Sequence, residues 1–359
     1  MPQFPLPPGS TIGVLGGGQL GRMLAEAASR LGFDVAVLER EADSPAGRVC
    51  ARLIVAAYDD GEGLRALAEA ADVVTFEFEN VPAASVAQLA QFGAEVAPGA
   101  RALAVAQDRF DEKTFLNANG CPTVAFAAAS TAAEAIDAVA RIGVPALMKT
   151  RREGYDGKGQ SWVKDVADAG RIFEALGGAR VIVEAAAPFV RELSVIAARG
   201  RDGEVAVYPL GENQHENGVL RRTSAPADIS PPTAAEAERI AARILDGLDY
   251  VGVIGVELFE MADGSLLVNE IAPRVHNTGH WTQDGCQVDQ FEQHIRAVAG
   301  WPLGPTDAIA RIEMLNLLGD EAGAWRSLAA EPATRVHLYG KRAAKPGRKM
   351  GHVNRVRPL

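Results

Sequence analysis

Several segments of the sequence gather residue types that could hold a phosphate group or a metal ion. The first is KTRREGYDGKGQ, residues 149–160, whose glycines are Gly154, Gly157 and Gly159. Because glycine lets backbone N–H groups approach an anion closely, this loop is suited to phosphate binding. Lys149 ends the apolar strand before the loop and would add a point charge for phosphate. The GxxxxGK[ST] pattern of a P-loop is absent, and a glycine-rich hairpin connection is the alternative interpretation.

The second segment carries two glutamates on a predicted hairpin. Residues 251–270, VGVIGVELFEMADGSLLVNE, contain two apolar strands joined by a turn at 262–264. If the strands pair around this turn, Glu257 and Glu270 face each other, with Asn269 beside them. Two carboxylates ~4 Å apart repel by about 4 kcal/mol at an effective dielectric constant near 20, a cost that a bound cation removes. Carboxylates combined with phosphate oxygens and water suit Mg²⁺. Solvation of both side chains at a sheet edge is the alternative.

Polar and aromatic residues follow this hairpin directly. The segment APRVHNTGHWT, residues 272–282, has no amphipathic period, and its polar and aromatic members are Arg274, His276, Asn277, His280 and Trp281. A single histidine is more often structural than functional. Here two histidines, an arginine and an asparagine follow a candidate metal ligand, which favours a site.

A basic segment lies near the C-terminus. Residues 341–349, KRAAKPGRK, surround a Pro-Gly turn, and their cations include Lys341, Lys345, Arg348 and Lys349. Such a segment could clamp a substrate phosphate, because arginine binds phosphate in bidentate fashion. A solvated basic surface is the alternative.

The N-terminal segment TIGVLGGGQLGRM, residues 11–23, contains a GxGxxG pattern made by Gly16, Gly18 and Gly21. An acidic residue, Glu39, ends the next predicted strand, as in a dinucleotide-binding turn. Helix N-termini bind many anions, however, so this pattern does not select a dinucleotide by itself.

Alternating apolar and alanine-rich stretches indicate how these segments are positioned. Strands are predicted at residues 12–15, 34–38, 53–56 and 72–76, with helices at 19–31 and 63–70. This alternation predicts a parallel sheet wound with helices. After a helix at 109–118 the pattern changes to short strands with few helices between them, which is typical of α+β structure. A helix at 289–299 precedes the last 60 or so residues.

Composition and net charge narrow the classes of molecule that the protein could bind. The net charge is −10, from 46 acidic and 36 basic residues, and a field of this sign disfavours nucleic acid. Local basic clusters still allow small phosphorylated ligands. The sequence holds no apolar run of the ~20 residues that a membrane span needs, and MPQFPLPPGS lacks the layout of a signal peptide. Three scattered cysteines argue against a disulfide framework and a zinc site. We therefore expect a cytoplasmic protein.

Taken in order, these segments resemble the ATP-grasp superfamily and, within it, the family of N5-carboxyaminoimidazole ribonucleotide synthetases. The matching motifs are GVLGGGQLGRML (13–24), AQDRFDEKTFL (106–116), GYDGKGQ (154–160), NEIAPRVHNTGHWT (269–282) and the basic tail. The pair GGGQLGRM and PRVHNTGHWT is highly specific, whereas either glycine loop alone is weak. The resemblance implies an ATP-grasp architecture that combines α/β and α+β structure. Its expected domains are an N-terminal Rossmann-like parallel-sheet domain over 1–108, a central ATP-grasp domain over 109–300 and a small C-terminal domain over 301–359.

The resemblance also implies roles for individual residues. Those expected to hold ATP are Arg109 and Lys149 at the phosphates, Gly154, Tyr155, Asp156, Gly157, Lys158, Gly159 and Gln160 in a lid, Glu184, Ala185, Ala186 and Ala187 at the adenine, Glu192 at the ribose, His215 near the phosphates, and Asn269 beside the metal. Those expected to bind Mg²⁺ are Glu257 and Glu270. The expected catalytic pocket for bicarbonate is made by Arg274, His276 and Asn277 with Lys149. The expected ribonucleotide site is made by Gln19, Glu77, Tyr155, Lys341 and Arg348, with Glu79 as the alternative to Glu77.

The implied reaction is the ATP- and bicarbonate-dependent carboxylation of 5-aminoimidazole ribonucleotide in de novo purine biosynthesis. ATP would convert bicarbonate to carboxyphosphate, and the carboxyl group would pass to the exocyclic amine of the ribonucleotide. This chemistry uses ATP and Mg²⁺ and does not require biotin, and relatives of this kind suggest a homodimer. The alternatives are another ATP-grasp ligase, such as a formate-dependent glycinamide ribonucleotide transformylase, and an NAD-dependent dehydrogenase.

Overall fold

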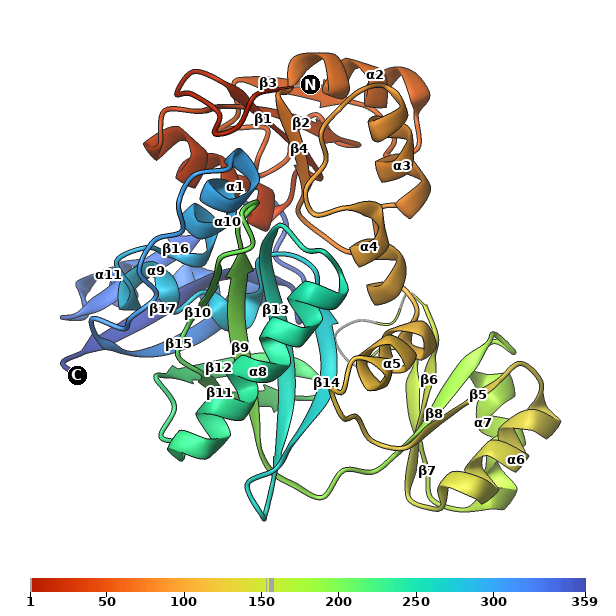
Figure 1. The fold of residues 1–359 in the computed structure, drawn as a ribbon. Helices are drawn as coiled ribbons and strands as arrows, with labels where there is room; N and C mark the ends of the chain where they lie inside the picture. The colour runs from red at the N-terminus through yellow and green to blue at the C-terminus, as the bar shows by residue number, and fades with distance from the viewer. Residues whose placement is uncertain (1, 153, 155–157) are drawn as a thin grey trace.

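The computed structural model describes residues 2–152, 154 and 158–359. Four residues of the glycine-rich segment, Glu153, Tyr155, Asp156 and Gly157, therefore lie outside the described residues. The described strands form three sheets, one in the N-terminal part and two in the rest of the chain (Figure 1). Among the described helices, none is long and apolar enough to cross a membrane.

The N-terminal part is a parallel sheet wound with helices, as predicted. Its strand order is β3-β2-β1-β4, with each strand parallel to its neighbours. The elements are β1 (Thr11–Leu15), α1 (Gln19–Arg30), β2 (Asp34–Glu39), β3 (Arg52–Val55), α2 (Gly61–Ala70), β4 (Val73–Phe76), α3 (Ala83–Gln91) and α4 (Ala100–Ala106). The residues that end β1, β2 and β4 therefore meet at one edge of the sheet, where α1 begins.

A small antiparallel sheet follows, with strand order β5-β8-β6-β7. Its elements are α5 (Arg109–Ala118), β5 (Phe126–Ala129), α6 (Ala132–Ile142), β6 (Ala146–Thr150), β7 (Gln160–Val163), α7 (Ala169–Ala175) and β8 (Val181–Ala185). The prediction of few helices here was wrong for α6, which begins where the Thr131 side chain accepts a hydrogen bond from Glu134 N at 3.2 Å.

A nine-stranded sheet fills the rest of the chain, in the order β14-β13-β9-β11-β12-β15-β17-β16, with β10 on β9. Its strands are β9 (Phe189–Arg199), β10 (Val205–Val207), β11 (Gly211–Glu216), β12 (Val219–Ala225), β13 (Gly252–Met261), β14 (Leu266–Ala272), β15 (Arg311–Leu318), β16 (Thr334–Leu338) and β17 (Lys349–Arg357). The helices are α8 (Pro231–Gly247), α9 (Thr282–Gly285), α10 (Gln290–Ala299) and α11 (Trp325–Ala330). The long α8 was also not predicted; Ser230 caps it and Pro231 occupies its first position.

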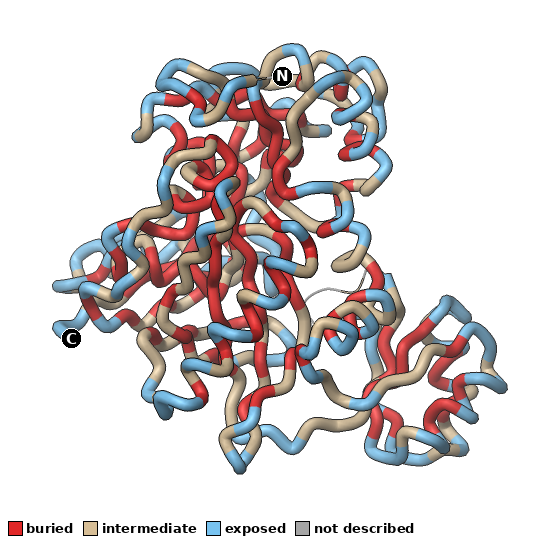
Figure 2. The backbone as a smooth tube through the Cα atoms, in the orientation of Figure 1, coloured by how far each residue is buried: buried red, intermediate tan, exposed pale blue. Residues whose placement is uncertain are grey.

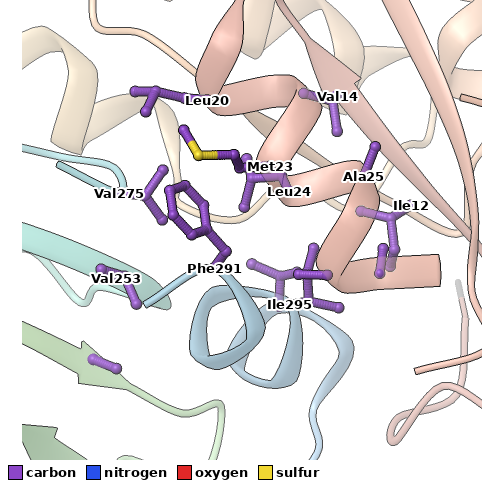
Figure 3. Packing of buried hydrophobic residues seen from close by; sticks show 14 of the residues in the cluster. Ile12, Val14, Leu20, Met23, Leu24, Ala25, Val253, Val275, Phe291 and Ile295 are labelled. Carbon is purple, nitrogen blue, oxygen red and sulfur yellow. The ribbon is translucent and has the colours of Figure 1, made fainter. Parts of the chain in front are cut away.

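One hydrophobic core joins the N-terminal sheet to the nine-stranded sheet. Buried residues run along the strands of the large sheet and under the N-terminal helices (Figure 2). Leu20 and Leu24 of α1 meet Phe291 and Ile295 of α10, with Val253 of β13 beneath them (Figure 3). Each such side chain contributes roughly 1.5–3 kcal/mol when it is fully buried. This packing holds the N-terminal sheet against the large sheet.

His294 of α10 lies fully buried in the same joint. Its Nε2 is 2.8 Å from Thr75 Oγ1 on β4, and its Nδ1 accepts a hydrogen bond from Val253 N on β13 at 3.0 Å. Burial lowers the pKa of His294 to about 3, so the neutral imidazole links the two sheets.

This link predicts a loss of stability in acid. Because the folded pKa lies below the ordinary 6.5, the unfolded chain binds the proton more tightly, and stability falls as the pH drops below 6.5. The cost is about 1.4 kcal/mol per pH unit, or about 2 kcal/mol at pH 5. We expect His294→Gln to remove this part of the decline in the free energy of unfolding, measured with urea at pH 7 and pH 5. Identical declines in the variant and the parent protein would contradict the assignment.

Candidate active site

A cavity of about 430 Å³ opens between the small antiparallel sheet and the hairpin of β13 and β14. Many residues predicted from the sequence line it. They are Arg109, Lys149, Gly154, Gln160, Glu184, Ala185, Ala186, Ala187, Glu192, His215, Glu257, Asn269, Glu270, Arg274, His276 and Asn277. The cavity has the size of a small-molecule site, and it collects residues from both sheets.

Lys149 and Glu184 form a charged pair at the inner wall of the cavity. Lys149 Nζ lies 2.7 Å from one oxygen of Glu184, and Lys113 Nζ lies 3.5 Å from the other. Burial raises the pKa of Glu184, but the ammonium groups of Lys149 and Lys113 outweigh this effect and hold the pKa below its usual value. Two lysines against one carboxylate leave an excess of positive charge, which suits a polyphosphate.

The two hairpin glutamates face each other as predicted, because Glu257 pairs with Glu270 across β13 and β14. Arg109 Nη1 lies 3.0 Å from Glu270 Oε2. Burial raises the pKa of Glu257, and the charge of Glu270 raises it further, to about 7. Burial raises the pKa of Glu270 as well, but the positive charges of Arg109 and Lys149 outweigh this effect and lower the pKa to about 2. The two carboxylates therefore repel each other.

The donor atoms of this pair suit a divalent cation. The donors of Glu257 and Glu270 are oxygen atoms, and the side chain of Asn269 belongs to the same cavity wall. Within the described ranges, no group of three or more His, Cys, Asp or Glu side chains could hold a metal ion by itself. This set matches Mg²⁺, which takes one or two carboxylates and completes its shell with water and substrate phosphates.

Arg274, His276 and Asn277 lie at one end of the cavity. Arg274 forms an ion pair with Glu79, which also lines the cavity. Burial, followed by the positive charge of Arg274, lowers the pKa of His276 to about 3, so its imidazole is neutral at physiological pH. The buried amide of Asn277 has no hydrogen-bond partner in the described part of the chain, which favours a ligand at this position.

Aromatic side chains form the other end of the cavity. Phe189 and Phe259 stack with ring centres 4.5 Å apart, and Trp162 lines the wall nearby. Glu192 pairs with His215 beside them. Flat apolar walls next to a polar pair are suited to a purine base and its ribose.

The glycine-rich segment connects β6 to β7, which pair as a hairpin at the cavity. Arg109 Nη2 donates a hydrogen bond to Gly154 O at 3.0 Å, so the start of the segment contacts the same arginine that binds Glu270. Lys158 and Gly159 are described, but they are not among the residues that line the cavity. Tyr155, Asp156 and Gly157 are the predicted lid residues outside the description.

The GxGxxG turn binds the chain's own carboxylates. Gly18 N and Gly21 N both donate hydrogen bonds to Glu77, the second at 2.6 Å, and Gly17 N donates to Glu39 at 2.7 Å. In a dinucleotide-binding fold these amides face the pyrophosphate. Glu77 occupies that position, which argues against the NAD-dependent alternative.

The predicted ribonucleotide residues lie around this turn and at the basic segment. The structure describes Gln19, Glu77, Lys341 and Arg348, but these four residues do not line the cavity. Lys341 Nζ donates a hydrogen bond to Lys349 O at 2.9 Å, and the side chain of Lys349 does line the cavity. The basic segment thus reaches the site at the start of β17.

Several cavity residues were not predicted as site residues. They include Glu112, Trp162, Phe189 and Phe259, whereas Lys349 was named only as one cation of the basic segment. A signal was available for Glu112, because it lies three residues after Arg109 and therefore on the same face of α5. The aromatic residues carry no such signal, since they come from strands far apart in the sequence.

Comparisons with known proteins agree with this geometry. Residues 114–291 match the model of the ATP-grasp domain, residues 10–107 the ribonucleotide synthetase preATP-grasp domain, and residues 313–358 the phosphoribosylaminoimidazole carboxylase C-terminal domain. An N5-carboxyaminoimidazole ribonucleotide synthase from Brucella melitensis is 49% identical, over 100% of this chain and 99% of that protein.

Solved structures give the same result. The ADP complex of an N5-carboxyaminoimidazole ribonucleotide synthetase superposes with a TM-score of 0.94 at 41% identity, covering 98% of this chain and 93% of that one. An Aspergillus clavatus synthase in complex with ADP and 5-aminoimidazole ribonucleotide gives 0.92 at 34% identity, with 98% and 95% covered. The chain therefore belongs to the N5-carboxyaminoimidazole ribonucleotide synthase family of ATP-grasp enzymes.

Proposed function

We propose that this chain carboxylates 5-aminoimidazole ribonucleotide with ATP and bicarbonate, forming N5-carboxyaminoimidazole ribonucleotide, ADP and phosphate, as a step of purine biosynthesis. One observation carries the proposal: Lys149, Arg109 and the Glu257–Glu270 pair converge on a single cavity. The family comparisons supply the identity of the acceptor.

The described residues suit transfer of the γ-phosphoryl group from ATP to bicarbonate. Lys149 and Arg109 are placed to neutralise the charge that develops on the transferred group. Glu257 and Glu270 would hold Mg²⁺, which would supply Lewis-acid stabilisation of the phosphoryl charge. The hairpin of β6 and β7 would cover the cavity and keep water from the carboxyphosphate formed.

The second half of the reaction belongs to the Arg274 end of the cavity. Arg274 would hold the carboxyphosphate anion, and the neutral His276 and the unpartnered amide of Asn277 would orient it. The ribonucleotide amine would then attack the carboxyl carbon and displace phosphate. The proposed binding residues for the ribonucleotide remain Gln19, Glu77, Lys341 and Arg348, with the two cations at its 5′-phosphate, and Tyr155, which lies outside the described residues.

A single substitution tests the phosphate clamp. Arg348→Ala removes a charged hydrogen-bond donor worth about 1.5–3 kcal/mol. We expect the KM for 5-aminoimidazole ribonucleotide to rise about 10- to 100-fold while the KM for ATP changes less than twofold. Steady-state kinetics with each substrate varied in turn measure both constants. Equal increases in the two constants would remove Arg348 from the clamp.

Isotope labelling and product analysis test the reaction itself. Labelled bicarbonate is expected to enter the product, and ADP release is expected to depend on 5-aminoimidazole ribonucleotide. Incorporation of labelled formate into glycinamide ribonucleotide would instead identify the transformylase alternative. NADH, titrated by fluorescence, is expected not to bind.

We further propose that the enzyme works in the cytoplasm as a homodimer. The free thiols of Cys50, Cys121 and Cys286 support a reducing compartment. Light scattering of the purified protein measures the assembly, and twice the mass of the chain is the expected value.

A further inference from the structure

Helix α5 contacts the strand that carries Glu270 in an unusual way. Strand β14 lies at the edge of the nine-stranded sheet, so one row of its backbone groups has no neighbouring strand. Helix α5 packs beside this edge (Figure 1). Its first residue, Arg109, already pairs with Glu270.

The next turn of α5 binds the backbone on both sides of Glu270. Ile271 N donates a hydrogen bond to Glu112 Oε1 at 2.6 Å, and Lys113 Nζ donates to Asn269 O at 3.0 Å. The first bond belongs to the peptide group after Glu270 and the second to the peptide group before it. Two consecutive side chains therefore fix both peptide groups of one metal-binding residue.

The pairing of β13 with β14 is irregular next to Glu270, so the backbone there needs hydrogen-bond partners from outside the sheet. Glu257 pairs with Glu270, but Leu258 pairs with Val268, so Asn269 is an extra residue on β14. Such a bulge leaves the extra residue out of the ladder and re-aims nearby side chains. Without Glu112 and Lys113, Ile271 N and Asn269 O would lose these hydrogen bonds.

Burial shows that this arrangement is costly. Glu112 and Lys113 are each only 2% exposed, although both carry ionisable groups. Burying an ionisable group is costly, because the group either stays charged in an unfavourable position or is neutralised by a shift of its pKa. A neutral side chain could satisfy an edge amide at lower cost, so their presence beside the metal site calls for a role in that site.

We propose that Glu112 and Lys113 are positioning residues that set the orientation of Glu270 toward Mg²⁺, an inference that rests on the proposed function. Partners of metal ligands commonly contribute 10- to 100-fold to metal affinity. The two residues act on Glu270 through hydrogen bonds to its backbone; Glu112 also lines the cavity, and Lys113 also pairs with Glu184 at 3.5 Å.

The test separates metal binding from nucleotide binding. Calorimetry measures the Kd of AMP-PNP with Mn²⁺ and the Kd of AMP-PNP in EDTA, and the ratio of the two reports the contribution of the metal. We expect Glu112→Leu, which removes the acceptor for Ile271 N, to reduce this ratio about 10-fold or more. Glu112→Gln keeps a carbonyl acceptor and is expected to stay within about threefold of the parent protein.

Two further variants keep the test decisive. Lys113→Met removes the donor to Asn269 O and is expected to act like Glu112→Leu, so the result stands if one of the two fails to fold. Glu260→Leu is the matched control, because Glu260 is a buried carboxylate on the same hairpin that pairs with Arg191. Its thermal midpoint is expected to fall while the metal ratio stays unchanged.

The outcomes separate the positioning role of Glu112 and Lys113 from the proposed function. A folded Glu112→Leu or Lys113→Met protein with an unchanged metal ratio overturns the positioning role and leaves the proposed function intact. A parent protein that binds AMP-PNP equally well with and without Mn²⁺ overturns both.

Discussion

Glu270→Gln is expected to reduce ribonucleotide-dependent ADP release about 100- to 1000-fold. Glutamine keeps the size of the side chain but removes the negative charge that faces Glu257 across the hairpin. The substitution would remove one of the two carboxylates of the proposed metal site, and Arg109 loses its ion-pair partner at the same time. The coupled measurement of ADP release at saturating ATP, bicarbonate and ribonucleotide gives kcat directly.

The control is Asp263→Asn at the turn of the same hairpin. Asp263 accepts hydrogen bonds from Ser265 and lies away from the cavity, so its loss is expected to leave kcat within twofold. Circular dichroism and thermal melting show whether Glu270→Gln keeps the fold. Near-normal turnover of a folded Glu270→Gln protein would remove Glu270 from the metal site.

Lys149→Met is expected to lower kcat about 100- to 1000-fold and to raise the KM for ATP. Methionine is similar in length but carries no charge, so the phosphates lose a cation that is 8% exposed and therefore poorly screened by water. Glu184 keeps Lys113 as a partner at 3.5 Å, which limits the structural damage. Initial rates at varied ATP concentration measure both constants.

A lysine on the same small sheet provides the comparison. Lys164 follows β7 and is exposed, so Lys164→Met changes the net charge equally without touching the cavity. We expect wild-type kinetics from it. If both lysine variants lose the same modest amount of activity, the effect of Lys149 is one of general charge, and its contact with the phosphates is disproved.

The hairpin and the parallel sheet could be predicted because their signals are local. A turn at 262–264 between two apolar strands predicts the hairpin, but counting from the turn puts Glu257 opposite Asn269. The bulge at Asn269, which the sequence does not reveal, shifts the register by one residue and puts Glu257 opposite Glu270. Helices separate most strands of the N-terminal sheet, although β3 follows β2 without one. Helix α6 was missed although its buried residues, Ala135, Ala138 and Val139, recur at helical spacing, so its signal was present in the sequence.

Other parts of the site depend on distant contacts. The sequence shows several cations at 341–349, but only the pairing of β17 with β15 decides that Lys349 reaches the cavity. Likewise, Glu77 lies 56 residues from Gly21, and nothing local indicates that its carboxylate binds the amides of the glycine turn. Such long-range partners are set by packing rather than by spacing.

The hydrogen-bonded sheet that runs from β14 to β16 has a mechanical consequence. Strands paired in one sheet do not slide past one another independently, so we expect the hairpin of Glu257 and Glu270 and the start of β17 to move as one unit. We expect any movement that opens and closes the cavity to come from the four-stranded sheet that carries Lys149, because that sheet is separate from the large one.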